Sequence, residues 1–102
     1  MSLRRFVTLR WLRMDYACEP AINDFIAKYG KGGKPTIHET VKACWKIARR
    51  DWVWWILDGV LPPDLFNQWH WKGGDRRTDI RFALLYQRLA DAQGKKKRKG
   101  KR

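Results

Sequence analysis

The sequence has few of the residues on which covalent catalysis, metal modules and disulfide frameworks depend. Ser2 is the only serine, and Cys18 and Cys44, which stand 26 residues apart, are the only cysteines. A nucleophilic triad needs a nucleophile beside a base, and zinc modules or disulfide frameworks need more Cys or His at short spacing. We therefore expect no triad, no metal and no cofactor, and we expect both cysteines to be small buried residues of helices.

Long hydrophobic runs are also missing. The apolar stretch after Arg5 is interrupted by Arg10 and Arg13, and the most apolar run, residues 52–57, ends at Asp58. A signal-peptide core or a transmembrane helix needs a longer uncharged stretch, about 20 residues for a full span. We therefore expect a cytoplasmic protein that makes no contact with a membrane.

Acidic residues are scarce and scattered, with 10 Asp and Glu against 23 Lys and Arg. Two-metal hydrolysis needs carboxylates gathered in one place. One close pair, Asp75 and Asp79, falls near the start of a predicted helix, where negative charge is favourable without any metal. The glycines at 30, 32 and 33 lack the Lys-Ser/Thr ending of a phosphate-binding P-loop. These absences predict that the chain is not an enzyme and has no small-molecule substrate.

What the sequence has in excess is positive charge, a formal net charge of +13. The last eight residues carry seven cations and no anion, and the remainder still holds 16 basic against 10 acidic residues. A field of this sign favours polyanions and accelerates association with them. The side chains after Gly94 are unsuited to a core. We therefore expect a single helical domain over residues 1–94 and a basic, disordered tail over residues 95–102.

Apolar periodicity and capping signals predict helices in the first half of the chain. An amphipathic stripe runs through residues 18–29, with Pro20 in the first turn and Gly30 at the end. Thr36 and Glu39 have the spacing of a capping box, which predicts that a second helix begins there.

The second half contains a nearly wholly apolar stretch, residues 52–61, which we expect to be the most buried element. Residues 49–51 before it can continue the preceding helix or start a new one with Asp51 as its N-cap. Residues 64–74 lack clean periodicity, so we expect a loop with one helical turn at most. Thr78 can cap a last helix that runs to about Gln93 and carries arginines at the margins of its apolar stripe.

Residues 3–13 are ambiguous. Val7, Leu9 and Trp11 alternate as in a strand, whereas Phe6 and Leu12 blur the pattern. A helix is favoured because no other segment offers a strand with which to pair. The chain as a whole is predicted to be all-α, a compact small bundle of three to five helices with a disordered basic C-terminal tail.

Two clusters of cations are candidates for contact with nucleic acid. The tail can neutralise phosphates or merely keep the protein soluble. In the second cluster Trp69 and Trp71 can stack on unpaired bases, or they can fold back as a lid over the helices. The candidate binding residues are the tail cations Lys95, Lys96, Lys97, Arg98, Lys99, Lys101 and Arg102, the second cluster Trp69, Trp71, Lys72, Arg76 and Arg77, and the loop residues Lys31 and Lys34.

A pattern of small, acidic and tryptophan residues covers about 40 residues of the chain. It consists of Ala17-Cys18-Glu19-Pro20-Ala21, then Phe25, Thr36 and Ala43, and finally Arg49-Arg50-Asp51-Trp52-Val53-Trp54-Trp55-Ile56-Leu57. This pattern resembles a small helical repeat of bacteriophage and prophage proteins, although Arg50 replaces the repeat's usual glycine and Cys44 stands near a usual tryptophan. The resemblance implies a phage origin and a helix-pair packing unit, with Asp51 as a cap and with Trp52 and Trp55 wedged between helices. It implies no particular activity.

The charge and the resemblance lead to two hypotheses about function. In the first, this is a small basic phage-type accessory protein that binds DNA or RNA through phosphate contacts from its tail and its basic face. In the alternative, it is a phage-encoded inhibitor that docks on a host protein, such as a defence nuclease or a polymerase, through a tryptophan-rich surface.

Deleting residues 95–102 separates the two hypotheses. A nucleic-acid complex should weaken on deletion and with salt, because each neutralised phosphate adds about 0.9 to the log–log salt slope on duplex DNA. A partner held by apolar contacts should stay bound at high salt and be lost when Trp69 or Trp71 becomes Ala. An electrophoretic shift assay on single- and double-stranded DNA and RNA, with and without the tail, measures the difference. Absence of any shift at low salt contradicts the first hypothesis.

Overall fold

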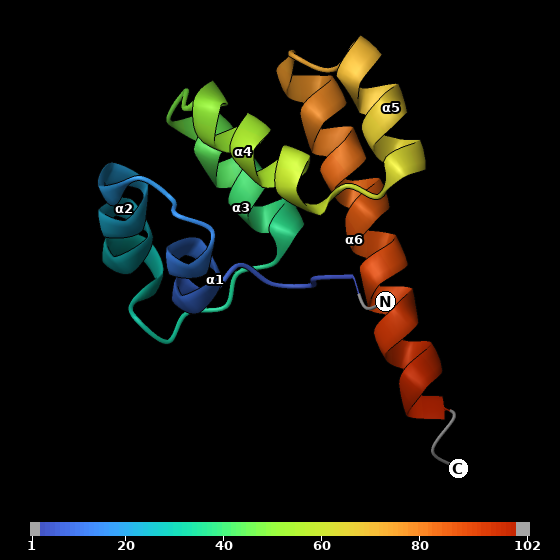
Figure 1. Ribbon diagram of the computed structural model, residues 1–102, viewed down its shortest axis with the longest axis horizontal. Helices are drawn as coiled ribbons and strands as arrows, with labels where there is room; N and C mark the ends of the chain where they lie inside the picture. The colour runs from blue at the N-terminus through green and yellow to red at the C-terminus, as the bar shows by residue number, and fades with distance from the viewer. Residues whose placement is uncertain (1–2, 100–102) are drawn as a thin grey trace.

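The computed structural model describes the backbone of residues 3–99 and the side chains of residues 3–93. Within that range the chain forms six helices and no extended sheet, so the all-α prediction is confirmed, with one helix more than the expected three to five (Figure 1). The helices are α1 (Leu9–Met14), α2 (Glu19–Tyr29), α3 (Ile37–Lys46), α4 (Arg50–Val60), α5 (Pro63–Lys72) and α6 (Arg76–Lys99).

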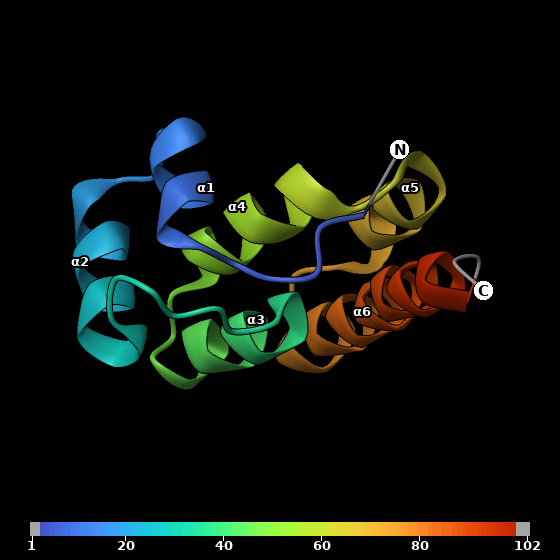
Figure 2. The same ribbon diagram turned by 90° about the horizontal axis from the view of Figure 1, so that it is seen from below.

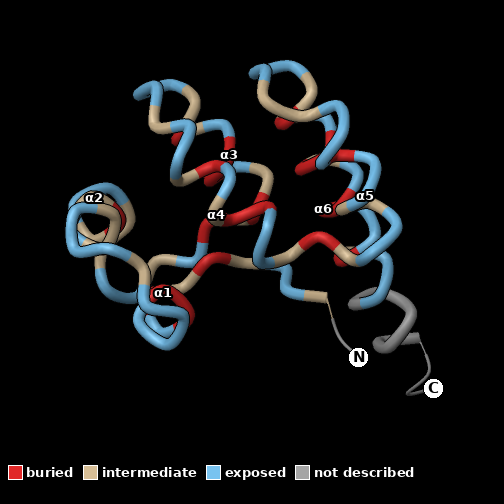
Figure 3. Tube along the Cα trace, turned by 45° about the horizontal axis from the view of Figure 1, so that its top comes forward, coloured by how far each residue is buried: buried red, intermediate tan, exposed pale blue. Residues whose placement is uncertain are grey.

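The helices are arranged as three neighbouring pairs. α1 and α2 lie at one end, α5 and α6 at the other, and α3 and α4 lie between them (Figures 1 and 2). The most extensive packing is between α3 and α6, and buried positions follow α3, α4 and α6, whereas in α2 only Phe25 is buried (Figure 3). The centre of the protein is therefore α3, which packs on both α6 and α4.

The first residues are extended and only then helical, so the ambiguous segment divides in two. Phe6 forms an isolated antiparallel bridge with Thr36, in which the Val7 N–H donates to the Pro35 carbonyl over 2.8 Å. The favoured helix is therefore wrong for residues 3–8 and right from Leu9 onward. The extended segment pairs with the loop before α3, and the sequence of that loop has no strand periodicity.

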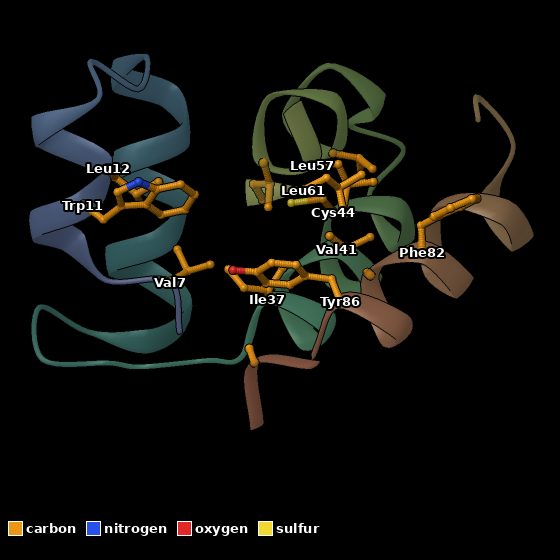
Figure 4. Close-up of a cluster of buried hydrophobic side chains, with 14 of the residues drawn as sticks. Val7, Trp11, Leu12, Ile37, Val41, Cys44, Leu57, Leu61, Phe82 and Tyr86 are labelled. Atoms are coloured by element: carbon orange, nitrogen blue, oxygen red, sulfur yellow. The ribbon is translucent and has the colours of Figure 1, made fainter. Parts of the chain in front are cut away.

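Val7 connects the α1–α2 end of the protein to its centre. Its side chain is 1% exposed and extends from the N-terminal segment toward Ile37 and Tyr86 (Figure 4). Beside it, Trp11 of α1 packs on Trp55 of α4, with 5.2 Å between ring centroids. These contacts attach the smaller pair of helices to the larger core.

The helix signals of the first half are confirmed. α2 begins with Pro20 in its first turn and ends at Gly30, whose φ of +75° is accessible to glycine without strain. At the start of α3 the Thr36 hydroxyl accepts from the Glu39 N–H, and the Glu39 carboxylate accepts from the Thr36 N–H. These hydrogen bonds lower the pKa of Glu39, because they favour its charged form.

The expectations for α4 need two corrections. The residue before the helix is Arg49 and no side chain caps its start; Asp51 lies in the first turn and pairs with Arg49 at 2.9 Å. Trp54, expected in the core, is 37% exposed, because the buried stripe of this amphipathic helix runs through Val53, Ile56 and Leu57 instead. Because nearly every residue of this stretch is apolar, the sequence alone does not show which side of the helix is buried.

The loop expected over residues 64–74 is instead the ten-residue helix α5. Pro63 occupies its first position, where the missing N–H costs nothing and the fixed φ favours a helix. Leu65, Phe66 and Trp69 are at least partly buried and pack with the core, which is helical spacing. Pro62 and Pro63 thus lie where α4 has ended and α5 begins.

α6 begins earlier and ends later than expected. Asp75, not Thr78, caps it: the carboxylate accepts from both the Thr78 N–H and the Thr78 hydroxyl, at 2.7 and 3.0 Å. Its backbone continues as helix past Gly94 to Lys99. The disordered tail was expected over residues 95–102. The structure describes the backbone of this stretch as far as Lys99, and its side chains and last three residues lie outside the described part of the chain.

A buried carboxylate fixes the corner between α5 and α6. Asp79 is 0% exposed, and its Oδ1 accepts from the Trp69 indole N–H at 2.8 Å and from the Gly74 N–H at 3.2 Å. At Gly73, a Cβ would lie 2.6 Å from the Trp69 Nε1. The corner therefore requires a small residue and a buried acceptor at these two positions.

Replacing Asp79 with Ala should lower the free energy of unfolding by about 2–4 kcal/mol, because the Trp69 and Gly74 donors lose their acceptor inside the protein. Chemical denaturation followed by circular dichroism measures the change. Asp58, which is exposed on α4, provides the matched control: Asp58→Ala should stay within about 0.5 kcal/mol of the parent. Equal losses in the two variants would show that Asp79 has no special structural role.

Candidate nucleic-acid interface

The solvent-facing side of α6 carries a row of arginines. Arg77, Arg81 and Arg88 are all exposed and lie on the side of the helix opposite its buried residues, among them Ala83 and Tyr86. Spacings of four and seven residues place them close to one line, about 6 and 10 Å apart along the axis. We call Arg77, Arg81 and Arg88 the α6 arginine row.

A shallow hollow lies at the N-terminal end of this row. Its lining consists of Arg76, Arg77 and Arg81, with Ile80 and Leu84 between them. Guanidinium groups bind phosphate oxygens in a forked geometry, and their flat faces also pack on aromatic rings. The hollow therefore combines phosphate-binding groups with an apolar floor.

The arginines of the row have no carboxylate partner among residues 3–93, where the ion pairs are Arg5–Asp91, Lys28–Asp24 and Arg49–Asp51. The nearby carboxylates on the last helix are engaged elsewhere. Asp91 accepts from Arg5 and from the Gln87 amide, and Asp75 accepts from Thr78, which lowers the pKa of Asp75. The positive field of the row is thus left for an external anion.

The two tryptophans of the second cluster differ in burial. Trp69 is 1% exposed, packs on Trp54 at 4.6 Å and donates to Asp79, so it cannot stack on a base. Trp71 is 86% exposed. Trp69 therefore folds back over the helices, whereas Trp71 is free to contact a ligand. The two rings differ because residues two apart on a helix point to nearly opposite sides.

The remaining predicted site residues fall into three groups. Lys72 and Arg76 are exposed at the α5–α6 corner, beside the row. Lys31 and Lys34 are exposed in the loop between α2 and α3, on the side of α1 and α2 and away from that corner (Figures 1 and 2). The tail cations Lys95, Lys96, Lys97, Arg98, Lys99, Lys101 and Arg102 lie outside the part of the chain whose side chains are described.

The sequence-based site omitted Arg81 and Arg88. Their spacing from Arg77 was a usable signal, because it repeats the period of the helix on its polar face. The same register continues in the sequence to Lys95 and Lys99, and the backbone of α6 is helical through both. Residues 76–102 hold 11 basic and 2 acidic residues, so they contribute +9 of the net charge of +13.

α6 projects beyond the other helices. The N-terminal segment lies along it, with the Leu3 N–H donating to the Gln93 Oε1 at 2.8 Å and the Tyr86 hydroxyl donating to the Arg4 carbonyl at 2.7 Å. Past this contact the helix runs clear of the other five (Figure 1). The helical backbone thus continues from the part of α6 that is anchored by the N-terminal segment into the most basic stretch of the sequence.

No protein-family model, curated protein or solved structure matches this chain. No helix in the described range is long and apolar enough to cross a membrane. Among the described residues, no three His, Cys, Asp or Glu side chains gather in a group that could hold a metal ion.

A second concave feature lies between the α1–α2 pair and the α3–α4 pair. It is a cavity of about 310 Å³, lined mainly by apolar side chains, with the Asp24–Lys28 ion pair and Asp51 also in its wall. Both cysteines line it, although only Cys44 is buried; Cys18 is exposed at the residue before α2, so its expected burial in a helix is wrong.

Burial raises the pKa of the Cys44 thiol to about 11, which keeps it protonated at neutral pH. We expect iodoacetamide at neutral pH to modify Cys18 and to leave Cys44 intact in the folded protein, because the thiolate is the reacting species. Mass spectrometry of the alkylated protein should show one modification, and two after denaturation. Equal labelling of both thiols in the folded state would contradict the burial of Cys44.

Proposed function

We propose that this protein binds nucleic acid, and that the α6 arginine row together with the basic residues that follow it in the sequence forms the contact surface. The observation that carries the proposal is the row itself. Three exposed guanidinium groups lie on one face of a helix, and no carboxylate in the described chain is paired with them. Phosphates are the anions that such a repeated, forked set of donors binds best.

The shape of α6 supports this proposal. From Arg77 to Lys99 the helical backbone extends about 33 Å, and its end stands away from the rest of the protein (Figure 1). A narrow exposed helix can follow a nucleic-acid backbone or enter a groove without interference from the other helices. Phosphate contacts of this kind supply affinity and orientation, and they carry no sequence information.

The alternative, an inhibitor that docks on another protein, needs a continuous apolar surface. Burial of Trp69 removes one of the two rings expected there. The exposed large apolar side chains are spread over five places in the described chain. They are Met14 and Tyr16 in and after α1, Ile47 after α3, Trp54 in α4, Trp71 in α5, and Leu85 and Leu89 in α6. Interfaces that depend on apolar hot spots gather their aromatic anchors at one centre. The distribution of exposed apolar groups therefore favours the nucleic-acid proposal.

Changing Arg77, Arg81 and Arg88 together to Gln tests the proposal. We expect binding to a labelled oligonucleotide at low salt to weaken by at least about tenfold. The log–log salt slope should become shallower by about 2 to 3, because three phosphate contacts are lost. Fluorescence anisotropy titrations at several salt concentrations measure both quantities.

The matched control removes the same charge from outside α6. Arg10 and Arg13 are exposed in α1 and Lys42 is exposed in α3, and changing all three to Gln should alter the slope by less than about 1. Equal losses in the two triple variants would mean that net charge alone determines binding. That result would overturn the assignment of α6 as the contact surface.

A further inference from the structure

Trp71 is the one tryptophan of the chain that the fold does not use. Trp11 and Trp69 are buried, Trp45, Trp52 and Trp55 are partly buried against the core, and Trp54 packs on Trp69. Trp71 is 86% exposed, and its described aromatic contact is an edge-on one to His70 at 5.9 Å between centroids. An indole exposes a large apolar surface to water in this position, which favours a partner that covers it.

The position of Trp71 is fixed although its ring is free. Trp69, two residues earlier, is held by its hydrogen bond to buried Asp79, and the turn that follows is tight because Gly73 packs against Trp69. The backbone that carries Trp71 is therefore part of the rigid corner between α5 and α6. A ring on a fixed support loses little conformational entropy when it stacks on a ligand.

The surroundings of this ring are cationic. Lys72 follows it directly, and Arg76 and Arg77 open the next helix, all exposed. Arg77, the first member of the α6 arginine row, is six positions after Trp71, so their Cα atoms lie at most about 22 Å apart. The exposed carboxylate at the corner, Asp75, is held by two hydrogen bonds from Thr78. One strand of nucleic acid can therefore contact both the ring and the start of the α6 arginine row.

We propose that the nucleic acid bound by this protein is single-stranded, with an unpaired base stacked on the Trp71 indole while the α6 arginine row holds the backbone. This inference rests on the proposed function and adds the class of nucleic acid. A flat aromatic face can stack only on a base whose own face is free, and bases inside a duplex already have both faces covered. A ring beside phosphate-binding arginines is thus of use with unpaired bases and of little use along a duplex.

The test compares a labelled single strand with the duplex of the same sequence, by fluorescence anisotropy, for the full chain and for three variants. Trp71→Ala should weaken single-strand binding by about 5-fold or more, because stacking on a tryptophan contributes roughly 1–3 kcal/mol per base and each 1.4 kcal/mol is tenfold. Its duplex affinity should change by less than about twofold. Trp71→Phe should retain most of the single-strand affinity.

Tyr16→Ala is the matched control, because Tyr16 is 92% exposed at the far end of the protein, and it should bind as the parent does. Circular dichroism and the unfolding midpoint should be the same for all variants, since neither side chain is part of the core. The quenching of the exposed tryptophan by the single strand gives a second readout: it should be present in the parent and absent in Trp71→Ala.

The possible results separate this inference from the function on which it rests. If the parent binds neither strand form at low salt, the nucleic-acid proposal itself is wrong. If the triple arginine variant loses binding while Trp71→Ala binds the single strand as the parent does, phosphate binding stands and the stacking inference is overturned. An equal loss of single-strand and duplex binding in Trp71→Ala also overturns it, because the ring would then contact something common to both.

Discussion

The hydrogen bond between the Trp69 indole and the buried carboxylate of Asp79 holds α5 against α6. It joins α5 to α6 inside the core, and the same carboxylate oxygen accepts from Gly74 in the turn between them. Since Trp69 must face inward, Trp71 must face outward. The direction of α6 follows from the same contact, because Asp79 lies on the buried side of that helix and the α6 arginine row lies on the other.

A second constraint is the use of the few carboxylates. Glu39 and Asp75 cap helices, Asp24, Asp51 and Asp91 pair with cations elsewhere, and Asp79 is buried. With most acids occupied in this way, Arg77, Arg81 and Arg88 have no carboxylate partner among the described side chains. Surface ion pairs contribute little stability, so leaving these cations unpaired has a small cost for folding. The benefit is a positive field concentrated on one projecting helix.

The fold was predictable from the sequence wherever a local rule determined it. The capping box at Thr36 and the glycine at position 30 mark α3 and α2 correctly, because capping depends on residues a few positions apart. The failures share a different cause. α5 has a weak amphipathic pattern that only packing against α6 reveals, and the extended segment before Leu9 pairs with a loop that carries no strand signal. The opposite fates of Trp69 and Trp71 likewise depend on the long-range partner Asp79, while the arginine row was already visible as a helical spacing.

The bonding of the chain's first described residues to its last helix has a consequence for biosynthesis. Leu3, Arg4 and Arg5 take their partners from α6, at residues 86–93, and the acceptor for Trp69 also lies on α6. A nascent chain that has not yet reached α6 lacks all of these contacts, so α1 to α5 cannot complete the native core as they emerge from the ribosome. The native core can therefore form only once α6 is available to pack against the N-terminal segment and α5.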